Sequence, residues 1–76
     1  MGKIKFVVVD ENVLGFINPA YPEYVEVLHA PIDTIKGRLF WYGHKLRPAT
    51  RQDFVDYNVS FECYLKNPER YNFPAN

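Results

Sequence analysis

The chain has 76 residues, and nine Lys or Arg balance nine Asp or Glu, so its formal net charge at pH 7 is zero. This length suits one domain over residues 1–76, and the single cysteine excludes an internal disulfide. The apolar run near the start is too short for a signal peptide or a membrane span. We therefore expect a cytoplasmic protein without membrane contact.

Aromatic residues are abundant, with six Phe, six Tyr and one Trp. Each ring buries about 150–250 Å² when it is packed in a protein interior. A domain of this size has too little interior to enclose every ring, so we expect some of them in an exposed patch or a subunit interface. The composition therefore predicts a protein partner or self-association, with a homodimer as the simplest form.

The first third of the chain predicts a β-hairpin. Charged and apolar residues alternate along Lys3–Val9, Asp10–Asn12 supplies a turn, and Val13–Ile17 forms the second apolar run. Gly15 interrupts this second run and indicates a β-bulge or the close approach of another backbone.

A third strand is predicted after a proline-rich break, beginning near Glu23 and stopping at Pro31. Alternation along this strand places Val25, Val27 and His29 on one face. A histidine on an apolar face is expected to act as a packing residue.

The middle of the chain predicts a second hairpin. Ile32–Lys36 fits a turn of helix begun by Asp33, and Arg38–Tyr42 fits a fourth strand with apolar side chains on both faces. Gly43–His44 supplies a tight reversal, after which Lys45–Arg47 is expected to pair back as a short fifth strand. This hairpin would project basic side chains from both of its arms.

One helix has a clear start signal. The hydroxyl group of Thr50 is suited to cap the first turn, and Asp53 completes a capping-box pattern at the positive end of the helix dipole. Phe54 and Tyr57 would face the sheet, and Asn58 marks the helix end.

The region after this helix fits two periodicities. Residues 59–65 fit either a longer helix or a strand, and the extended segment is favoured because β-branched and aromatic residues suit strands. Asn67–Tyr71 predicts a turn, and residues 74–76 predict a frayed end. The expected fold is α+β, a small antiparallel sheet of four or five strands with one short helix, and an SH3-like small β-barrel is the alternative.

The segment Arg47-Pro48-Ala49-Thr50 is followed by two variable residues and then by Asp53-Phe54. In this segment the chain resembles short uncharacterised bacterial and prophage-type proteins. The resemblance covers about eight residues of a helix-start pattern and carries no activity. It implies a cytoplasmic bacterial or phage accessory protein.

The sequence from 34 to 52 contains no acidic residue but holds five of the nine Lys and Arg. Cations next to aromatic rings are typical of protein hot spots and of surfaces that bind single-stranded nucleic acid. We expect a non-enzymatic protein-binding module with Trp41 or Tyr42 as its anchor, and keep nucleic-acid binding and a merely solvated face as alternatives. The predicted contact residues are Lys36, Arg38, Phe40, Trp41, Tyr42, Lys45, Arg47 and Arg51.

The chain offers little for catalysis or metal binding. Its soft ligands are His29, His44 and Cys63, and none of them lies at the short spacings of zinc sites. Cys63 is expected to behave as a small buried hydrophobic residue. No cofactor, metal ligand or catalytic residue is predicted, and a small enzyme or metal site that uses Cys63 and His29 is the least supported alternative.

Overall fold

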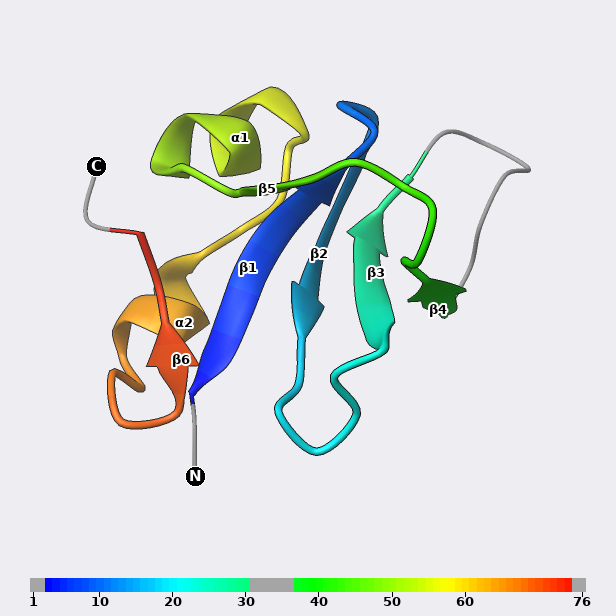
Figure 1. Cartoon of the computed structure of the whole chain (residues 1–76). Coiled ribbons are helices and arrows are strands. Elements are labelled where there is room, and N and C mark those ends of the chain that lie inside the picture. The colour runs from blue at the N-terminus through cyan, green and yellow to red at the C-terminus, as the bar shows by residue number, and fades with distance from the viewer. Residues whose placement is uncertain (1–2, 31–36, 75–76) are drawn as a thin grey trace.

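The computed structural model describes residues 3–30 and 37–74, and its strands form one six-stranded sheet (Figure 1). The expected turn at Ile32–Lys36 lies outside these residues. In the described ranges no helix is long and apolar enough to span a membrane. The elements are β1 (Ile4–Val9), β2 (Val13–Ile17), β3 (Tyr24–His29), β4 (Arg38–Phe40), β5 (Leu46–Pro48), α1 (Arg51–Asp56), α2 (Glu62–Leu65) and β6 (Tyr71–Asn72).

The first predicted hairpin is confirmed. β1 and β2 are antiparallel, and Val9 lies opposite Val13 at the end of their ladder. The turn between them carries Asp10 at φ 52° and Glu11 at φ 58°, both in the left-handed region that non-glycine residues seldom adopt. Neighbouring side chains must therefore hold this turn in place.

Gly15 marks a close approach of two backbones, as its sequence context predicts. A Cβ atom at this position would lie 2.5 Å from the carbonyl oxygen of Glu26 and 2.5 Å from Cγ1 of Val25, both on β3. Because real Cβ atoms do not come this close to such neighbours, glycine is the residue that lets β2 and β3 pair here.

A β-bulge accompanies this close approach and changes the face of the sheet to which the last side chains of β3 point. Leu14 lies opposite His29 while Gly15 lies opposite Val27, so one residue of β3 between them is unpaired. The ring of His29 stacks on that of Tyr57, the C-cap residue of α1, with 5.4 Å between centroids and 6° between planes. The predicted placement of His29 with the valines of β3 is therefore wrong, because the extra residue reverses the alternation.

The strand order is β4-β3-β2-β1-β5, and the short β6 pairs in parallel with β1 on the same edge as β5. The predicted pairing of the fourth and fifth strands is wrong, because β4 pairs with β3 and β5 pairs with β1. Residues 41–45 instead cross from one edge of the sheet to the other. The edge strands β4 and β5 are not paired with each other, so the α+β expectation is confirmed with an open sheet and not an SH3-like barrel.

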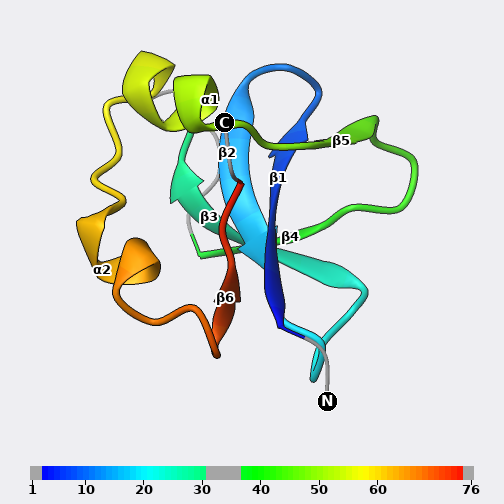
Figure 2. The same cartoon turned by 90° about the vertical axis from the view of Figure 1, so that its left-hand side faces the viewer.

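Each face of the sheet has its own hydrophobic core. Figure 2 shows both helices on one side of the sheet and the connection from β4 to β5 on the other. The buried residues on the helix side are Ile4, Phe6, Val8, Leu14, Ala49 and Phe54. Those on the opposite side are Val7, Val9, Val13 and Val25, which are covered by partly buried residues including Leu39, Trp41 and Leu46. Burial of Trp41 and Leu46 against these valines explains why the connection crosses the sheet instead of turning back as a hairpin.

The capped start of α1 is confirmed. The backbone N–H of Asp53 donates to Oγ1 of Thr50 at 3.3 Å, and the backbone N–H of Thr50 donates to Oδ2 of Asp53 at 2.7 Å. Phe54 is fully buried and Tyr57 packs against the same core, as their spacing predicts. Asn58 follows at φ 59°, which is consistent with its predicted role as a helix stop.

Replacing Thr50 tests this cap. We expect Thr50→Ala to lower the free energy of unfolding by about 1 kcal/mol, because one helix N–H loses its acceptor. Thr50→Ser keeps the hydroxyl group and should retain most of the stability. Chemical denaturation of the three proteins measures the difference, and equal midpoints for the alanine and serine variants would contradict a capping role for the hydroxyl group.

The extended segment favoured for residues 59–65 is wrong at its C-terminal end, where Glu62–Leu65 form α2. The rings of Phe61 and Tyr64 both pack against the core on the helix side. A separation of three residues brings two side chains to one face of a helix, whereas a strand would point them to opposite faces. Cys63 is exposed, so its predicted burial is also wrong.

The C-terminal segment returns the chain to β1. Asn67 stabilises the predicted turn, since its side-chain amide donates to the carbonyl oxygen of Cys63 at 2.8 Å and its own carbonyl accepts from the N–H of Tyr71 at 3.1 Å. β6 follows, which the sequence did not indicate. The predicted frayed end covers Pro74, which is described, and residues 75–76, which lie outside the described residues.

Candidate functional site

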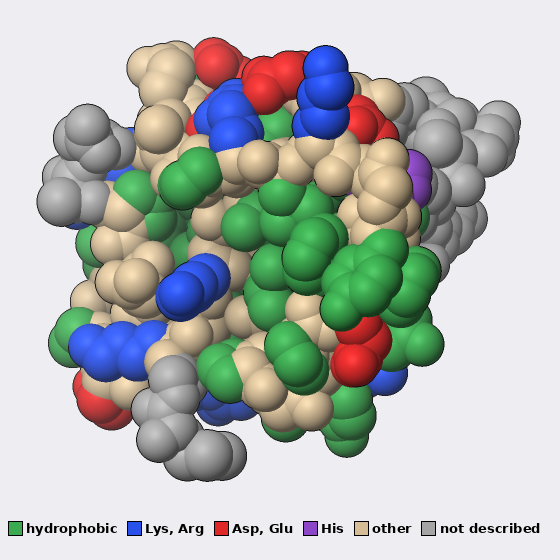
Figure 3. All heavy atoms as spheres, viewed as in Figure 1, with side chains coloured by type: hydrophobic (Ala, Val, Ile, Leu, Met, Phe, Trp, Pro, Cys, Tyr) green, Lys and Arg blue, Asp and Glu red, His purple; other side chains and the backbone are tan. Residues whose placement is uncertain are grey.

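Aromatic side chains gather at the edge strand β4 and around the start of β3. We call Tyr21, Tyr24, Arg38, Phe40, Trp41 and Tyr42 the aromatic patch. Tyr21, Phe40 and Tyr42 are 48%, 49% and 59% exposed, which is unusual for such large rings. The Phe40 ring centroid lies 5.7 Å from that of Tyr24 and 4.8 Å from that of Tyr42, so the rings form a continuous surface. Figure 3 views the face of the sheet that the connection from β4 to β5 crosses, and it shows hydrophobic side chains gathered where β2, β3 and β4 lie.

Strand register explains why these residues meet. Tyr24 lies opposite Phe40, and Glu26 lies opposite Arg38. Both pairs are non-hydrogen-bonded pairs of the antiparallel ladder, in which facing side chains come closest. Tyr21 and Tyr24 were not predicted as contact residues. The pairing of β3 with β4 reveals Tyr24, and the contact with Arg38 reveals Tyr21, because both residues are distant from the basic segment in the sequence.

Trp41 is held more firmly than the other rings. Its indole N–H donates to the carbonyl oxygen of Pro22 at 2.7 Å, and its ring packs against the valine core beside Leu39 and Leu46. The ring of Tyr42 packs against that of Trp41 in a T-shaped arrangement, with 4.7 Å between centroids. Of the two anchors proposed from the sequence, Trp41 fixes the connection between the strands, whereas Tyr42 is free to meet a partner.

Arg38 is the cation of the aromatic patch. Its Nε donates to Oε2 of Glu26 at 2.6 Å, and its guanidinium carbon lies 4.8 Å from the centroid of the Tyr21 ring. Half of its side chain is still exposed. The carboxylate of Glu26 and the ring of Tyr21 therefore orient the guanidinium group of a side chain that stays accessible to solvent.

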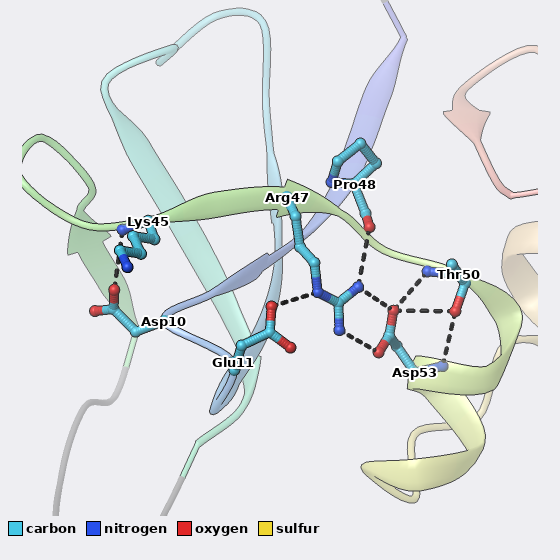
Figure 4. Close-up of polar contacts among 7 residues, drawn as sticks. All are labelled: Asp10, Glu11, Lys45, Arg47, Pro48, Thr50 and Asp53. Carbon is cyan, nitrogen blue, oxygen red and sulfur yellow. Dashed lines mark hydrogen bonds and ion pairs between the residues drawn. The ribbon is translucent and has the colours of Figure 1, made fainter.

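Arg47 lies in a different environment, in which carboxylates surround it (Figure 4). Its Nη1 and Nη2 atoms donate to the two carboxylate oxygens of Asp53 at 2.9 and 2.8 Å, and its Nε donates to Oε2 of Glu11 at 2.5 Å. This bidentate pair ties β5 to α1, and the contact with Glu11 ties both to the β1–β2 turn.

The same cluster sets the ionisation of Asp53. The guanidinium of Arg47 lowers its pKa from the ordinary 3.8 to about 2, although burial opposes this shift and the hydrogen bonds from Thr50 assist it. The carboxylates of Asp53 and Glu11 in turn raise the pKa of Arg47. The group is thus a fixed ion pair at neutral pH. A permanently ionised carboxylate is poorly suited to act as a general acid.

The strained turn is held by a second carboxylate. Asp10 accepts a hydrogen bond from the backbone N–H of Lys45 at 2.9 Å, and its Oδ2 lies 2.6 Å from Nδ1 of His44. The hydrogen bond with His44 is the main reason that the pKa of Asp10 is lowered. Together with the Glu11–Arg47 contact, this explains how the left-handed turn persists. The exposed side chain of His44 is a turn residue, as expected, but one with an acidic partner.

The predicted contact residues therefore fall into separate groups. Arg38, Phe40, Trp41 and Tyr42 lie together in the aromatic patch. Lys45 and Arg47 lie beside the β1–β2 turn, where they contact Asp10 and Glu11. Arg51 is directed to the C-terminal segment, where its Nε donates to the carbonyl oxygen of Pro74 at 3.0 Å and its guanidinium lies 5.6 Å from the ring centroid of Phe73. Lys36 lies outside the described residues.

The soft ligands do not assemble into a site. Within residues 3–30 and 37–74, no group of three or more His, Cys, Asp or Glu side chains could hold a metal ion. A cavity of about 490 Å³ opens beside β1, where β5 and β6 end, and its lining includes Phe6, Ala49 and Phe73. Neither His29 nor Cys63 lines this cavity.

Comparison of the chain with protein-family models, with curated proteins and with solved structures found no match. The resemblance of Arg47–Phe54 to bacterial and prophage-type proteins therefore stays a prediction. Among the described residues, the aromatic patch gathers three large exposed rings, Tyr21, Phe40 and Tyr42.

Proposed function

We propose that the protein is a non-enzymatic, cytoplasmic protein-binding module that uses the aromatic patch as its contact surface. The observation that carries this proposal is the exposure of Phe40 and Tyr42, 49% and 59%, beside an oriented arginine. Tyr and Arg are enriched at the centres of protein interfaces because they combine a large apolar area with polar groups that can form hydrogen bonds.

The arrangement of the patch supports tight contact with a flat or shallow partner surface. Tyr24 and Trp41 support the exposed rings from the side, and Glu26 fixes the guanidinium of Arg38. Side chains that are held in place before binding lose little conformational freedom when the complex forms. Exposed rings with this support are therefore suited to bind.

The basic residues give weaker support to nucleic-acid binding. Arg47 is already neutralised by Glu11 and Asp53, and Arg38 is paired with Glu26. A phosphate would have to displace these carboxylates, and the chain has no net positive charge to attract a polyanion. This surface is therefore better suited to a protein than to a single strand.

Substituting the two most exposed rings of the patch, Phe40 in β4 and Tyr42 in the connection that follows it, tests the proposal. We expect Phe40→Ser with Tyr42→Ser to weaken partner binding by more than about tenfold, because hot-spot rings each contribute about 2 kcal/mol or more. The measurement is affinity capture with each purified protein as bait in an extract of the source cell, with mass spectrometry of the retained proteins. A partner retained by the wild-type chain should be lost from this double variant.

A matched control removes apolar surface elsewhere. Val55 and Leu65 are 61% and 43% exposed but lie on the helices, away from the patch. Val55→Ser with Leu65→Ser should leave capture unchanged. Equal capture by the two double variants would refute the patch as the contact surface, and a response of Trp41 fluorescence to single-stranded DNA or RNA at low salt would support the nucleic-acid alternative instead.

A further inference from the structure

The outer side of β4 is an unpaired strand edge. The N–H of Val27 donates to the carbonyl oxygen of Gly37 at 2.7 Å, and the N–H of Trp41 donates to that of Glu23 at 3.4 Å. Gly37, Leu39 and Trp41 therefore direct their peptide groups toward β3, and the alternate residues direct theirs away from it. Since β4 is the last strand in the order, no described strand receives the N–H and C=O groups of Arg38 and Phe40.

The side chains at this edge are complementary to themselves. Arg38 and Phe40 are two residues apart, so they lie on one face of the strand. If two such strands pair in antiparallel fashion with Leu39 at the centre, each Arg38 lies opposite a Phe40 of the other strand. Facing residues of a hydrogen-bonded pair have Cα atoms about 5.5 Å apart, which lets a guanidinium group lie over a ring.

We propose that the partner at the aromatic patch is a second copy of this chain, joined by antiparallel pairing of β4 with β4 about a two-fold axis at Leu39. Arg38 and Phe40 of each copy would exchange backbone hydrogen bonds with Phe40 and Arg38 of the other. This inference rests on the proposed function, because it names the occupant of the same surface.

Existing contacts leave room for this pairing. The guanidinium of Arg38 lies beside the ring of Tyr21, and half of the Arg38 side chain is exposed, so a ring from the other copy can reach it. Glu26 balances the charge of Arg38 within each copy, so two copies can approach without repulsion between their arginines. The pairing continues one sheet through both copies, and the exposed rings of Tyr42 would lie at its margin.

Two substitutions at position 40 have opposite expected effects on this dimer. Phe40→Lys places like charges opposite each other twice, and should weaken self-association at least about tenfold. Phe40→Glu places a carboxylate opposite each Arg38, and should keep the dissociation constant within about threefold of the wild-type value. Position 40 is half-exposed, so neither change disturbs a buried core.

Sedimentation equilibrium of the purified proteins over a range from about micromolar to about millimolar concentration measures these effects. A second readout needs no variant: the backbone amides of Arg38 and Phe40 should become protected from hydrogen exchange as the wild-type concentration rises. A monomer throughout the range, equal weakening by both variants, or no concentration-dependent protection would overturn the proposed pairing.

The outcomes separate this inference from the proposed function. If the wild-type chain is monomeric but the Phe40→Ser, Tyr42→Ser variant still loses a captured protein, the second copy is the wrong occupant and the patch remains a protein-binding surface. If self-association and capture are both insensitive to the patch substitutions, the proposed function fails as well.

Discussion

Asp53→Ala should lower the free energy of unfolding by about 3 kcal/mol. The substitution removes both carboxylate oxygens from the bidentate pair with Arg47 and takes away the acceptor for the backbone N–H of Thr50. Loss of one partner of a buried ion pair costs about 3–5 kcal/mol, and the lower end applies here because Arg47 is partly exposed and keeps Glu11. Chemical denaturation at neutral pH measures the loss.

Asp56 provides the matched control on the same helix. It is exposed, and its carboxylate accepts one hydrogen bond, from the side chain of Gln52 at 2.9 Å. Asp56→Ala removes a negative charge and should cost less than about 0.5 kcal/mol. Similar losses in the two alanine variants would mean that the Arg47–Asp53 pair contributes nothing beyond helix propensity and charge.

The contribution of Asp53 should also depend on pH in a defined direction. Its pKa is lowered from 3.8 to about 2 in the folded chain, which corresponds to about 2 kcal/mol of stabilisation when the carboxylate is ionised. A carboxylate whose pKa is lowered by folding stabilises the folded state at pH values above its ordinary pKa of 3.8. This stabilisation is lost as the pH falls toward about 2. The stability difference between the wild-type chain and Asp53→Asn should therefore be constant above about pH 5 and shrink below it.

Local signals in the sequence predicted part of this fold well. Thr50 and Asp53 share one helix turn, so the cap depends only on neighbours and could be inferred from their spacing. The same holds for the hairpin of β1 and β2. The partner of Asp53 was not predictable in the same way, because the proximity of Arg47 depends on β5 lying next to β1.

The errors have the same origin in tertiary contacts. Pairing of β4 with β5 was predicted from a short reversal, but burial of Trp41 and Leu46 against the valine face draws the chain across the sheet. The aromatic patch was predicted in part, since Phe40, Trp41 and Tyr42 are consecutive in the sequence. Tyr24 enters the patch through strand register and Tyr21 through its contact with Arg38, and a local pattern specifies neither.

Gly15→Ala should be at least as damaging as the loss of Asp53, with an expected cost of about 3 kcal/mol. The new Cβ atom would lie 2.5 Å from the carbonyl oxygen of Glu26, which is backbone and cannot rotate away as a side chain would. β2 and β3 must then separate at the bulge, and the contacts of Val25 with the valine core would loosen. Thermal or chemical denaturation measures the loss, and native spectra at low denaturant would show whether the fold survives.

Gly43 separates this steric cost from the general cost of replacing glycine. Gly43 has φ +88°, and a Cβ atom there would meet nothing within 4 Å, so Gly43→Ala introduces backbone strain without a clash. That strain should cost about 1 kcal/mol. Gly15→Ala carries the opposite combination, a clash without a left-handed backbone, and should cost about three times as much. If the two alanine variants are equally stable, β2 and β3 can separate at this contact with little loss of stability. The absence of a side chain at Gly15 would then not be the reason for the register shift next to Leu14.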